Sequence, residues 1–282
     1  MIVNRIVNDN AMGKSETAVD TMDLRQARLM QVTLDRKPTL TKGDPLPPFW
    51  HYLYFNPQIL ASDLGPDGHE KLGRFIPDFG LPRRMWAGGR VEIEKPLLLG
   101  EEVEKTSTIR GVEEKTGRSG RLCFVTVDHD FSVGGEHRLR ETQNIVYREA
   151  PGPDSPAPAG KPAPDDAGFG RTVTPDPVML FRYSALIFYG HRIHYDADYA
   201  RDVEGYPGLV FHGPLTATLL IELGLERLDS RPLKAIDIRA MAPLFVTAPF
   251  ALEGRETAGG VELWARTPDG MTAMTVTLHA AP

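Results

Sequence analysis

Apolar and polar residues alternate in several stretches of the first half of the chain, with turn residues between them. Residues 122–131 read LCFVTVDHDF, and this period of two is typical of a strand with one buried face. The Val-Gly-Gly-Glu of residues 133–136 predicts a tight hairpin turn, and residues 139–147 the returning strand. Residues 101–112 are polar but compatible with a strand. The first half therefore predicts an antiparallel meander, preceded by a helix over residues 17–36 with Asp20 or Thr21 as N-cap.

The second half repeats this plan with one long helix inside it. Residues 178–186 form an apolar run that predicts a strand, and glycine-rich turns separate the later candidates. These later strand candidates are residues 235–246, 250–257, 261–267 and 271–279. Between the two groups, leucines at spacings of three to five predict a helix with one apolar side. They are Leu215, Leu219, Leu220, Leu223 and Leu228.

The entry of this helix is the first candidate for chemistry. Pro214 suits a first helical turn because its missing N–H has no partner to lose there, and Gly213 permits close approach to the backbone. Such a terminus presents free N–H groups and a partial positive charge, so it can hold an oxyanion such as the enolate oxygen of a thioester. An ordinary core helix with a tight entry turn is the alternative.

The loop before the helix is unusually rich in polar and titratable side chains. Its members are His191, Arg192, His194, Tyr195, Asp196 and Asp198, all within eight positions. One interpretation is a solvated loop with a histidine packed against a carboxylate. Another is a metal site formed by His191, His194 and Asp196, although these residues lie on a loop rather than at matched helical positions. The third is an active site that includes the helix entry.

A proline-rich stretch divides the chain into two nearly equal parts. Residues 150–168 contain six prolines among small and polar residues, so we expect this segment to be extended or mobile. We predict an N-terminal domain over residues 1–150, a linker over 151–169 and a C-terminal domain over 170–282. The predicted strands and helices make both domains α+β units.

Composition narrows the classes of partner. The chain has 282 residues, 41% of them hydrophobic and 25% charged, with a net charge of −6, which argues against a general nucleic-acid binder. The single cysteine, Cys123, excludes an internal disulfide and fits a reducing compartment. Since no apolar run approaches the roughly 20 residues of a membrane span, we expect a cytoplasmic protein without a membrane partner, either a monomer or a homodimer.

A second candidate site lies in the first half. Arg83, Arg84 and Arg90 surround Met85 and Trp86. Arginines bind phosphate through paired hydrogen bonds, and an indole offers a flat face for a base. This group predicts a clamp for the phosphates of a nucleotide-bearing ligand. The alternative is a set of surface arginines held by salt bridges.

Several of these residues resemble the hydratase motif of the MaoC-like family of hot-dog proteins. The matching positions are His194, Asp196, Ala200, His212 and Gly213. The string HRIHYD, with WHYLYF, RRMWAGGRVEIEKP and GRSGRLCFVTV, resembles the branch of mesaconyl-C4-CoA hydratases and hydroxyacyl-thioester dehydratases. Tyr189 stands where the motif has Asp and the branch usually has Asn. The resemblance covers residues 50–223.

The resemblance implies a double hot-dog fold, in which two antiparallel sheets each wrap around a central helix. It also implies a hydro-lyase that reversibly hydrates an α,β-unsaturated acyl-CoA thioester of the mesaconyl-C4-CoA type. The alternatives are an (R)-3-hydroxyacyl-ACP or -CoA dehydratase, a thioesterase, and a non-catalytic acyl-thioester-binding protein. CoA would be the carrier of the substrate, and the reaction would need no other cofactor and no metal.

Hydration requires a base for the water, an acid for Cα and donors for the enolate oxygen. We predict His194 as the base, because an imidazole titrates near neutral pH, and the N–H of Gly213 as the donor. Asp196 or the hydroxyl of Tyr189 would orient His194 or hold the water. His191 and Arg192 would meet a second substrate carboxylate. The resemblance also implies that His212, at the helix entry, is a substrate-binding residue.

Overall fold

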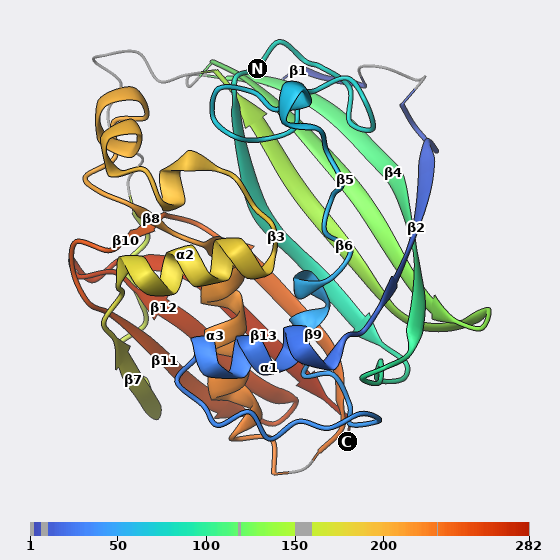
Figure 1. Ribbon diagram of the computed structural model, residues 1–282. Helices are drawn as coiled ribbons and strands as arrows, with labels where there is room; N and C mark the ends of the chain where they lie inside the picture. The colour runs from blue at the N-terminus through green and yellow to red at the C-terminus, as the bar shows by residue number, and fades with distance from the viewer. Residues whose placement is uncertain (1–2, 7–10, 118–119, 150–159, 230, 282) are drawn as a thin grey trace.

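The computed structural model describes residues 3–6, 11–117, 120–149, 160–229 and 231–281. Their main feature is one antiparallel sheet of eleven strands, in the order β1-β4-β5-β6-β3-β9-β13-β12-β11-β7 with β2 paired to β4 (Figure 1). Its strands are β1 (Val3–Ile6), β2 (Ser15–Thr21), β3 (Arg83–Ile93), β4 (Glu102–Gly117), β5 (Gly120–Val133), β6 (Glu136–Arg148), β7 (Phe169–Val173), β9 (Leu233–Ala240), β11 (Phe250–Thr257), β12 (Gly260–Arg266) and β13 (Thr272–Ala280). The meander predicted in the first half is therefore confirmed, and the candidates at 250–257, 261–267 and 271–279 are β11, β12 and β13. The candidate at 235–246 is two elements, since β9 ends at Ala240 and the short strand β10 (Leu244–Phe245) belongs to a separate two-stranded sheet.

Strand β3 joins the two halves, since it pairs with β6 on one side and with β9 on the other. Two glycines allow this close approach. A Cβ on Gly88 would lie 2.2 Å from the carbonyl oxygen of Ile238, and one on Gly89 would lie 1.8 Å from that of Thr142. This strand was not predicted, because its arginines suggested a phosphate clamp.

The predicted leucine-rich helix is α3 (Gly213–Leu225), and its residues from Leu215 to Gly224 are all buried. It lies across the C-terminal strands, as Figure 1 shows. A Cβ on Gly224 would lie 2.6 Å from Leu278 and 2.7 Å from Leu263, so the helix is seated directly on the sheet. No helix among the described residues is both long and apolar enough to span a membrane.

Two expected elements differ from the structure. Residues 17–36 divide into strand β2 and helix α1 (Leu24–Thr33), and the N-cap is Asp23, which accepts hydrogen bonds from two backbone N–H groups. The apolar run at 178–186, expected to be a strand, is helix α2 (Pro177–Leu186). Asp176 caps this helix and Pro177 occupies its first position, which is a helix-start signal that outweighs the apolar run.

In the N-terminal half, irregular chain covers much of the inner face of the sheet. Between α1 and β3 the only helical elements are the short 3₁₀ turns η1 (Trp50–Leu53) and η2 (Ala61–Asp63). Side chains of this segment pack on inner-face residues of β4–β6, namely Leu72, Phe75, Ile76 and Phe79 against a cluster with Cys123, Val125, Val127 and Tyr147. No helix as long as α3 lies in the described part of this half. This irregular covering brings loop residues to the boundary between the halves.

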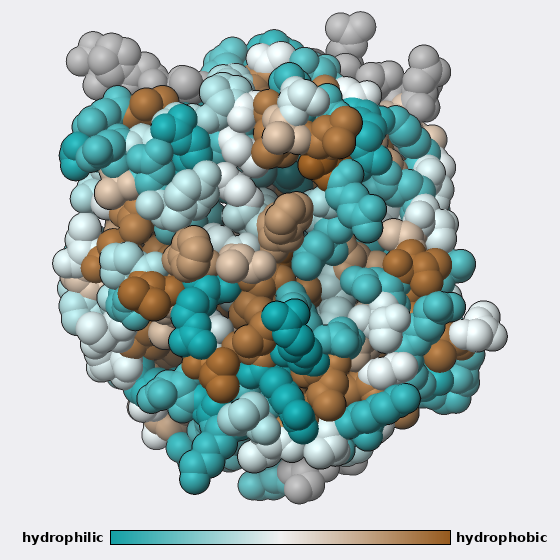
Figure 2. Space-filling model, viewed as in Figure 1, coloured by the Kyte–Doolittle hydropathy of each residue, from teal (hydrophilic) through white to brown (hydrophobic). Residues whose placement is uncertain are grey.

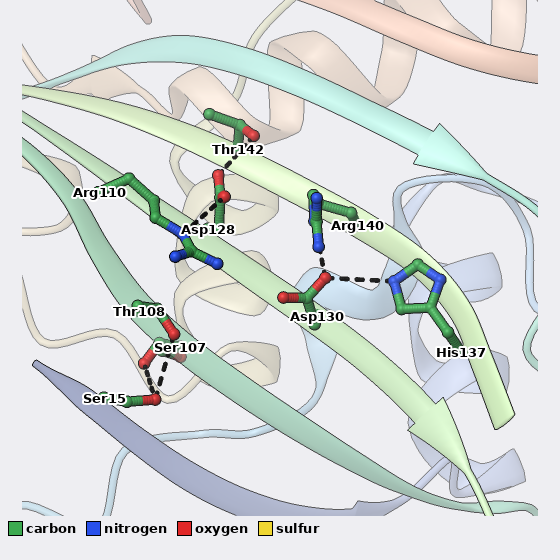
Figure 3. Close-up of polar contacts among 9 residues, drawn as sticks. All are labelled: Ser15, Ser107, Thr108, Arg110, Asp128, Asp130, His137, Arg140 and Thr142. Carbon is green, nitrogen blue, oxygen red and sulfur yellow. Dashed lines mark hydrogen bonds and ion pairs between the residues drawn. The ribbon is translucent and has the colours of Figure 1, made fainter. Parts of the chain in front are cut away.

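The outer face of the same strands is polar. Asp128 accepts hydrogen bonds from Arg110 (3.2 Å) and Thr142 (2.7 Å), while Asp130 binds Arg140 and His137 at 2.7 and 3.2 Å (Figure 3). On the face seen in Figure 2, apolar residues are gathered over α1 and α2.

The predicted linker falls partly outside the described residues, which exclude 150–159. Its later part is anchored on the C-terminal half rather than free. The N–H of Ala163 donates to the carbonyl of Gly270 at 3.0 Å, and that of Thr272 donates to Lys161 at 2.8 Å. The domain boundaries themselves stay a prediction.

Candidate active site

Tyr189 enters the site through the end of α2. The N–H of Tyr189 donates to the carbonyl of Ser184 at 2.8 Å, and that of Phe188 donates to Ala185 at 3.4 Å. This is a Schellman motif, with Phe188 at φ +48° in the left-handed position that usually holds glycine. Phe188 is 67% exposed, while Tyr189 turns toward the histidines of the following loop.

His194 is buried, and its ring orientation is fixed. It ends the 3₁₀ turn η3 (Arg192–His194), and its Nδ1 donates to the carbonyl of Val210, in strand β8 (Val210–Phe211), at 2.8 Å. With Nδ1 protonated by this bond, Nε2 carries the free lone pair. Burial lowers the pKa of His194 to about 4, although the Val210 bond opposes the shift. The ring is therefore a neutral proton acceptor at neutral pH.

His212 and Gly213 lie directly beside His194. The rings of His194 and His212 stack at 3.7 Å with an interplanar angle of 16°, and His212 is hydrogen-bonded to the Ser184 hydroxyl at 2.9 Å. No side chain caps α3, and Pro214 has no N–H to offer. A Cβ on Gly213 would lie 3.1 Å from Trp86. The N-terminus of α3 therefore lies beside the stacked rings of His194 and His212 and against Trp86.

A loop from the N-terminal half, which was not predicted as part of the site, completes it. His69 is hydrogen-bonded through Nε2 to the hydroxyl of Tyr189 and through Nδ1 to Asp67 at 2.9 Å. The N–H of Arg192 donates to the carbonyl of Asp67 at 2.9 Å. Asp67 and His69 sit in a glycine- and proline-rich stretch 120 positions before the motif, counted from His69 to Tyr189. The Asp-x-His spacing of these two residues was the one feature of the sequence that could have marked them as part of the site.

His191 faces this loop rather than a free substrate pocket. Its ring centroid lies 3.9 Å from that of His69, and burial, with the nearby His69 and His194, lowers the pKa of His191 to about 2. Ligand atoms of Asp67, His69 and His191 lie within 4.8 Å of one another. The group that could hold a metal therefore differs from the predicted set of His191, His194 and Asp196.

Asp196 and Arg192 bind each other, which changes the roles predicted for them. Their ion pair measures 2.8 Å, and Asp196 also accepts from the N–H of Tyr199 at 3.0 Å. The Arg192 guanidinium lies over the ring of Tyr199 at 4.0 Å. The bond that orients His194 comes from Val210, not from Asp196. Arg192 likewise has its charge satisfied within the turn, so it is not a free group for a substrate carboxylate.

The predicted arginine clamp is not assembled. Arg83 pairs with Glu204 at 3.0 Å, and Arg90 pairs with Asp237 at 2.8 Å across the β3–β9 seam. Arg84 is directly opposite the inward-facing Tyr147 in the β3–β6 register, and it is exposed to solvent. Among the described residues it is the one member of the three without an ion-pair partner. Trp86, two residues further on, lies against Gly213.

The electrostatics of the site favour neutral groups. Burial raises the pKa of the Tyr189 phenol, and the charge of Arg84 opposes this shift. Burial also lowers the pKa of His212 well below its ordinary value. The site thus combines a neutral imidazole base, a neutral phenol, a helix N-terminus without a side-chain cap, and Arg84, which has no ion-pair partner in the described part of the chain. Such a set can move a proton to and from a thioester substrate while stabilising an enolate oxygen.

Comparisons with known proteins identify the family and the fold of this chain. Residues 49–246 match the family of hydroxyacyl-thioester dehydratase type 2. The chain is 45% identical to the mesaconyl-C(4)-CoA hydratase of Chloroflexus aurantiacus, over 95% of this chain and 96% of that protein. HtdX of Mycobacterium tuberculosis has a similar fold, with a TM-score of 0.69 at 18% identity over 94% of this chain and 99% of that one. A double hot-dog protein of the same organism, at 13% identity and 98% coverage of both chains, gives 0.58. The fold is therefore the predicted double hot-dog, but its two sheets are joined through β3 and β9 into one, and a long central helix is present only in the C-terminal half of the described residues.

Proposed function

Because this chain belongs to the hydroxyacyl-thioester dehydratase type 2 family, we propose that it reversibly adds water to the double bond of an α,β-unsaturated acyl-CoA thioester. It is an enzyme of the hydratase/dehydratase type. The observation that carries the proposal is the position of His194. Its Nδ1 is held by Val210 at 2.8 Å, its Nε2 has no hydrogen-bond partner among the described residues, and its ring stacks on His212 at the entry of α3.

These residues account for each step of the hydration. Nε2 of His194 takes a proton from water as the water oxygen bonds to Cβ. The electron pair of the double bond moves to the thioester, where the N–H of Gly213 and the helix N-terminus stabilise the enolate oxygen. The His194 imidazolium then gives its proton to Cα. Because burial lowers the pKa of His194 to about 4, the imidazolium is a strong acid and returns the proton readily. Dehydration is the reverse.

We propose a substrate of the mesaconyl-C4-CoA type, with a second carboxylate, because a hydratase of that thioester is 45% identical to this chain. Arg84 is the residue best placed to bind this carboxylate. It extends from the inner face of β3, its charge acts on Tyr189, and it lacks an ion-pair partner among the described residues. An unpaired guanidinium can bind a carboxylate through two parallel hydrogen bonds. This role replaces the one predicted for Arg192.

The test is hydration of mesaconyl-C4-CoA and crotonyl-CoA by the purified full chain, followed as mass gain of one water. We expect His194→Ala to abolish water addition to both. Arg84→Gln should lower kcat/KM for the dicarboxylic substrate by roughly 100-fold, which corresponds to about 3 kcal/mol of a charge-assisted pair, and should change crotonyl-CoA turnover little. Arg90→Gln on the outer face is the matched control. Equal losses on both substrates would remove the carboxylate role of Arg84.

Hydration transfers only protons and one hydroxyl, so we expect no redox cofactor and no metal requirement. The same site catalysing the reverse reaction would make the protein a dehydratase of a 3-hydroxyacyl thioester. Whether hydration or dehydration dominates depends on the equilibrium between the two thioesters and not on the residues of the site. We also propose that residues 1–150 and 170–282 form two domains of this enzyme. The protein is expected to be a monomer or a homodimer.

A further inference from the structure

We propose that Asp67 and His69 are positioning residues of the active site, which fix the direction of the Tyr189 hydroxyl so that its oxygen accepts a hydrogen bond from the attacking water. This inference rests on the proposed hydration. It assigns a role to the N-terminal half, since both residues lie in the loop before β3, whereas Tyr189 and His194 belong to the C-terminal half. The site would then be incomplete in either half alone.

The hydrogen bonds around His69 define which atoms carry the protons. The Asp67 carboxylate accepts from the backbone N–H of His69 at 3.1 Å and contacts Nδ1 of the same ring at 2.9 Å. Burial would raise the pKa of Asp67, but the bonds to His69 prevail and lower it to about 2. An ionised carboxylate only accepts, so Nδ1 must carry a proton. A neutral imidazole carries a single proton, so Nε2 of this ring, which is only 10% exposed and lies against the Tyr189 hydroxyl, is an acceptor.

It follows that Tyr189 donates its hydroxyl proton to Nε2 of His69. The phenolic oxygen then has only lone pairs to offer toward His194, whose ring centroid lies 5.8 Å from that of Tyr189. A water between the two would donate one proton to Nε2 of His194 and the other to the oxygen of Tyr189. Both donations leave a water lone pair free to attack Cβ. A hydroxyl proton pointing into the site would instead occupy that lone pair.

The loop that carries Asp67 and His69 is held against the motif by its backbone. The carbonyl of Asp67 accepts from the N–H of Arg192 at 2.9 Å, and that of Pro66 accepts from the Arg192 guanidinium at 3.2 Å. Gly68 approaches Gly190 so closely that a Cβ would lie 1.9 Å from its carbonyl oxygen. The ring of His69 is only 10% exposed. Supporting groups held this rigidly are what a precise hydrogen-bond direction requires.

A metal bound by Asp67, His69 and His191 is the competing interpretation of the same cluster. Both nitrogens of His69 already have partners, in Asp67 and Tyr189. A metal would have to displace one of these bonds to reach a ring nitrogen. The positioning role needs no displacement, so the geometry favours it.

The test compares Tyr189→Phe, His69→Gln and the double variant in the hydration assay. If His69 acts through Tyr189, each single change lowers kcat by roughly 10- to 100-fold with little change in KM, and the double variant is no worse than Tyr189→Phe alone. His137→Gln, on the outer face, is the control and keeps the wild-type kcat. Losses that multiply in the double variant, or an unchanged kcat in His69→Gln, would overturn the proposal.

A second measurement uses the unaltered full chain, so its result does not depend on whether the variants fold. In ¹⁵N NMR of histidine side chains, His69 should show the neutral tautomer with the proton on Nδ1, and a proton on Nε2 would overturn the proposal. Zinc-dependent activity, lost with a chelator, would replace it with the metal site. If wild type hydrates but His69→Gln does so equally well, only this inference fails. If wild type adds no water to either thioester, the proposed function fails and this inference with it.

Discussion

Replacing Gly68 by alanine should separate the two parts of the active site without altering any polar side chain. A Cβ at this position would lie 1.9 Å from the carbonyl oxygen of Gly190 and 2.7 Å from its carbonyl carbon. Real Cβ atoms essentially never come closer than 3.0 Å to such atoms, so the loop must withdraw by at least about 1 Å. The loop carries Asp67 and His69, and therefore the partner of the Tyr189 hydroxyl.

The expected loss follows from this displacement. A misplacement of about 1 Å costs roughly 100-fold in rate where catalysis depends on positioning. Gly68→Ala should therefore lower kcat for hydration by about 100-fold. The φ of Gly68 is +86°, and a side chain in the left-handed region costs a further 1–2 kcal/mol, roughly, in folding stability. Steady-state kinetics at 25 °C, together with urea unfolding, measures the two effects separately.

The same loop offers a matched control. Gly73 has a φ of +108°, and a Cβ there would meet nothing within 4 Å. Gly73→Ala should therefore lose stability to a similar degree through backbone strain but keep its kcat. Wild-type kcat in Gly68→Ala would refute the reasoning, because the loop would then not need its observed position. Equal losses of kcat in both variants would show that general destabilisation, and not the contact with Gly190, explains the result.

Two further predictions concern protonation. Since burial lowers the pKa of His194 to about 4, the ring remains an unprotonated base down to that pH. The value of kcat/KM should therefore fall below about pH 5 with an apparent pKa near 4. An apparent pKa at the ordinary 6.5 would contradict the assignment of His194 as the base. His51→Leu should destabilise the fold by about 3–5 kcal/mol at pH 7, because it leaves Glu141 buried without its 3.0 Å partner. Burial would then raise the pKa of Glu141, which the His51 bond now holds below its ordinary value. Urea unfolding should therefore show a smaller loss at pH 4, and a loss independent of pH would contradict this.

The sequence predicted the sheet well because its strands alternate regularly. Strands β5, β11, β12 and β13 follow patterns with clear turns between them, and α3 follows its leucines. Helix α2 was predicted as a strand because its continuous apolar run has no helical period, although Asp176-Pro177 marked its start. Strand β3 was missed because its arginines suggested a binding site.

The site was predicted only where it is local in sequence. Tyr189, His194, His212 and Gly213 lie close together because one turn and one helix entry place them, and the motif spans few residues. His69 could not be placed, because its contact with Tyr189 depends on how the loop before β3 folds over the boundary between the halves. The pairing of Arg192 with Asp196 was missed because the turn that brings them together is not evident from their spacing.

The central claim is that His194 adds water to a carbon–carbon double bond. It is tested most directly by incubating mesaconyl-C4-CoA with wild type and His194→Ala in H₂¹⁸O and analysing the products by mass spectrometry. We expect intact CoA thioester that has gained one labelled water on its acyl chain, formed by wild type and not by the variant. Labelled free acid with release of CoA would instead identify a thioesterase. Equal hydration by the two proteins would contradict the role of His194.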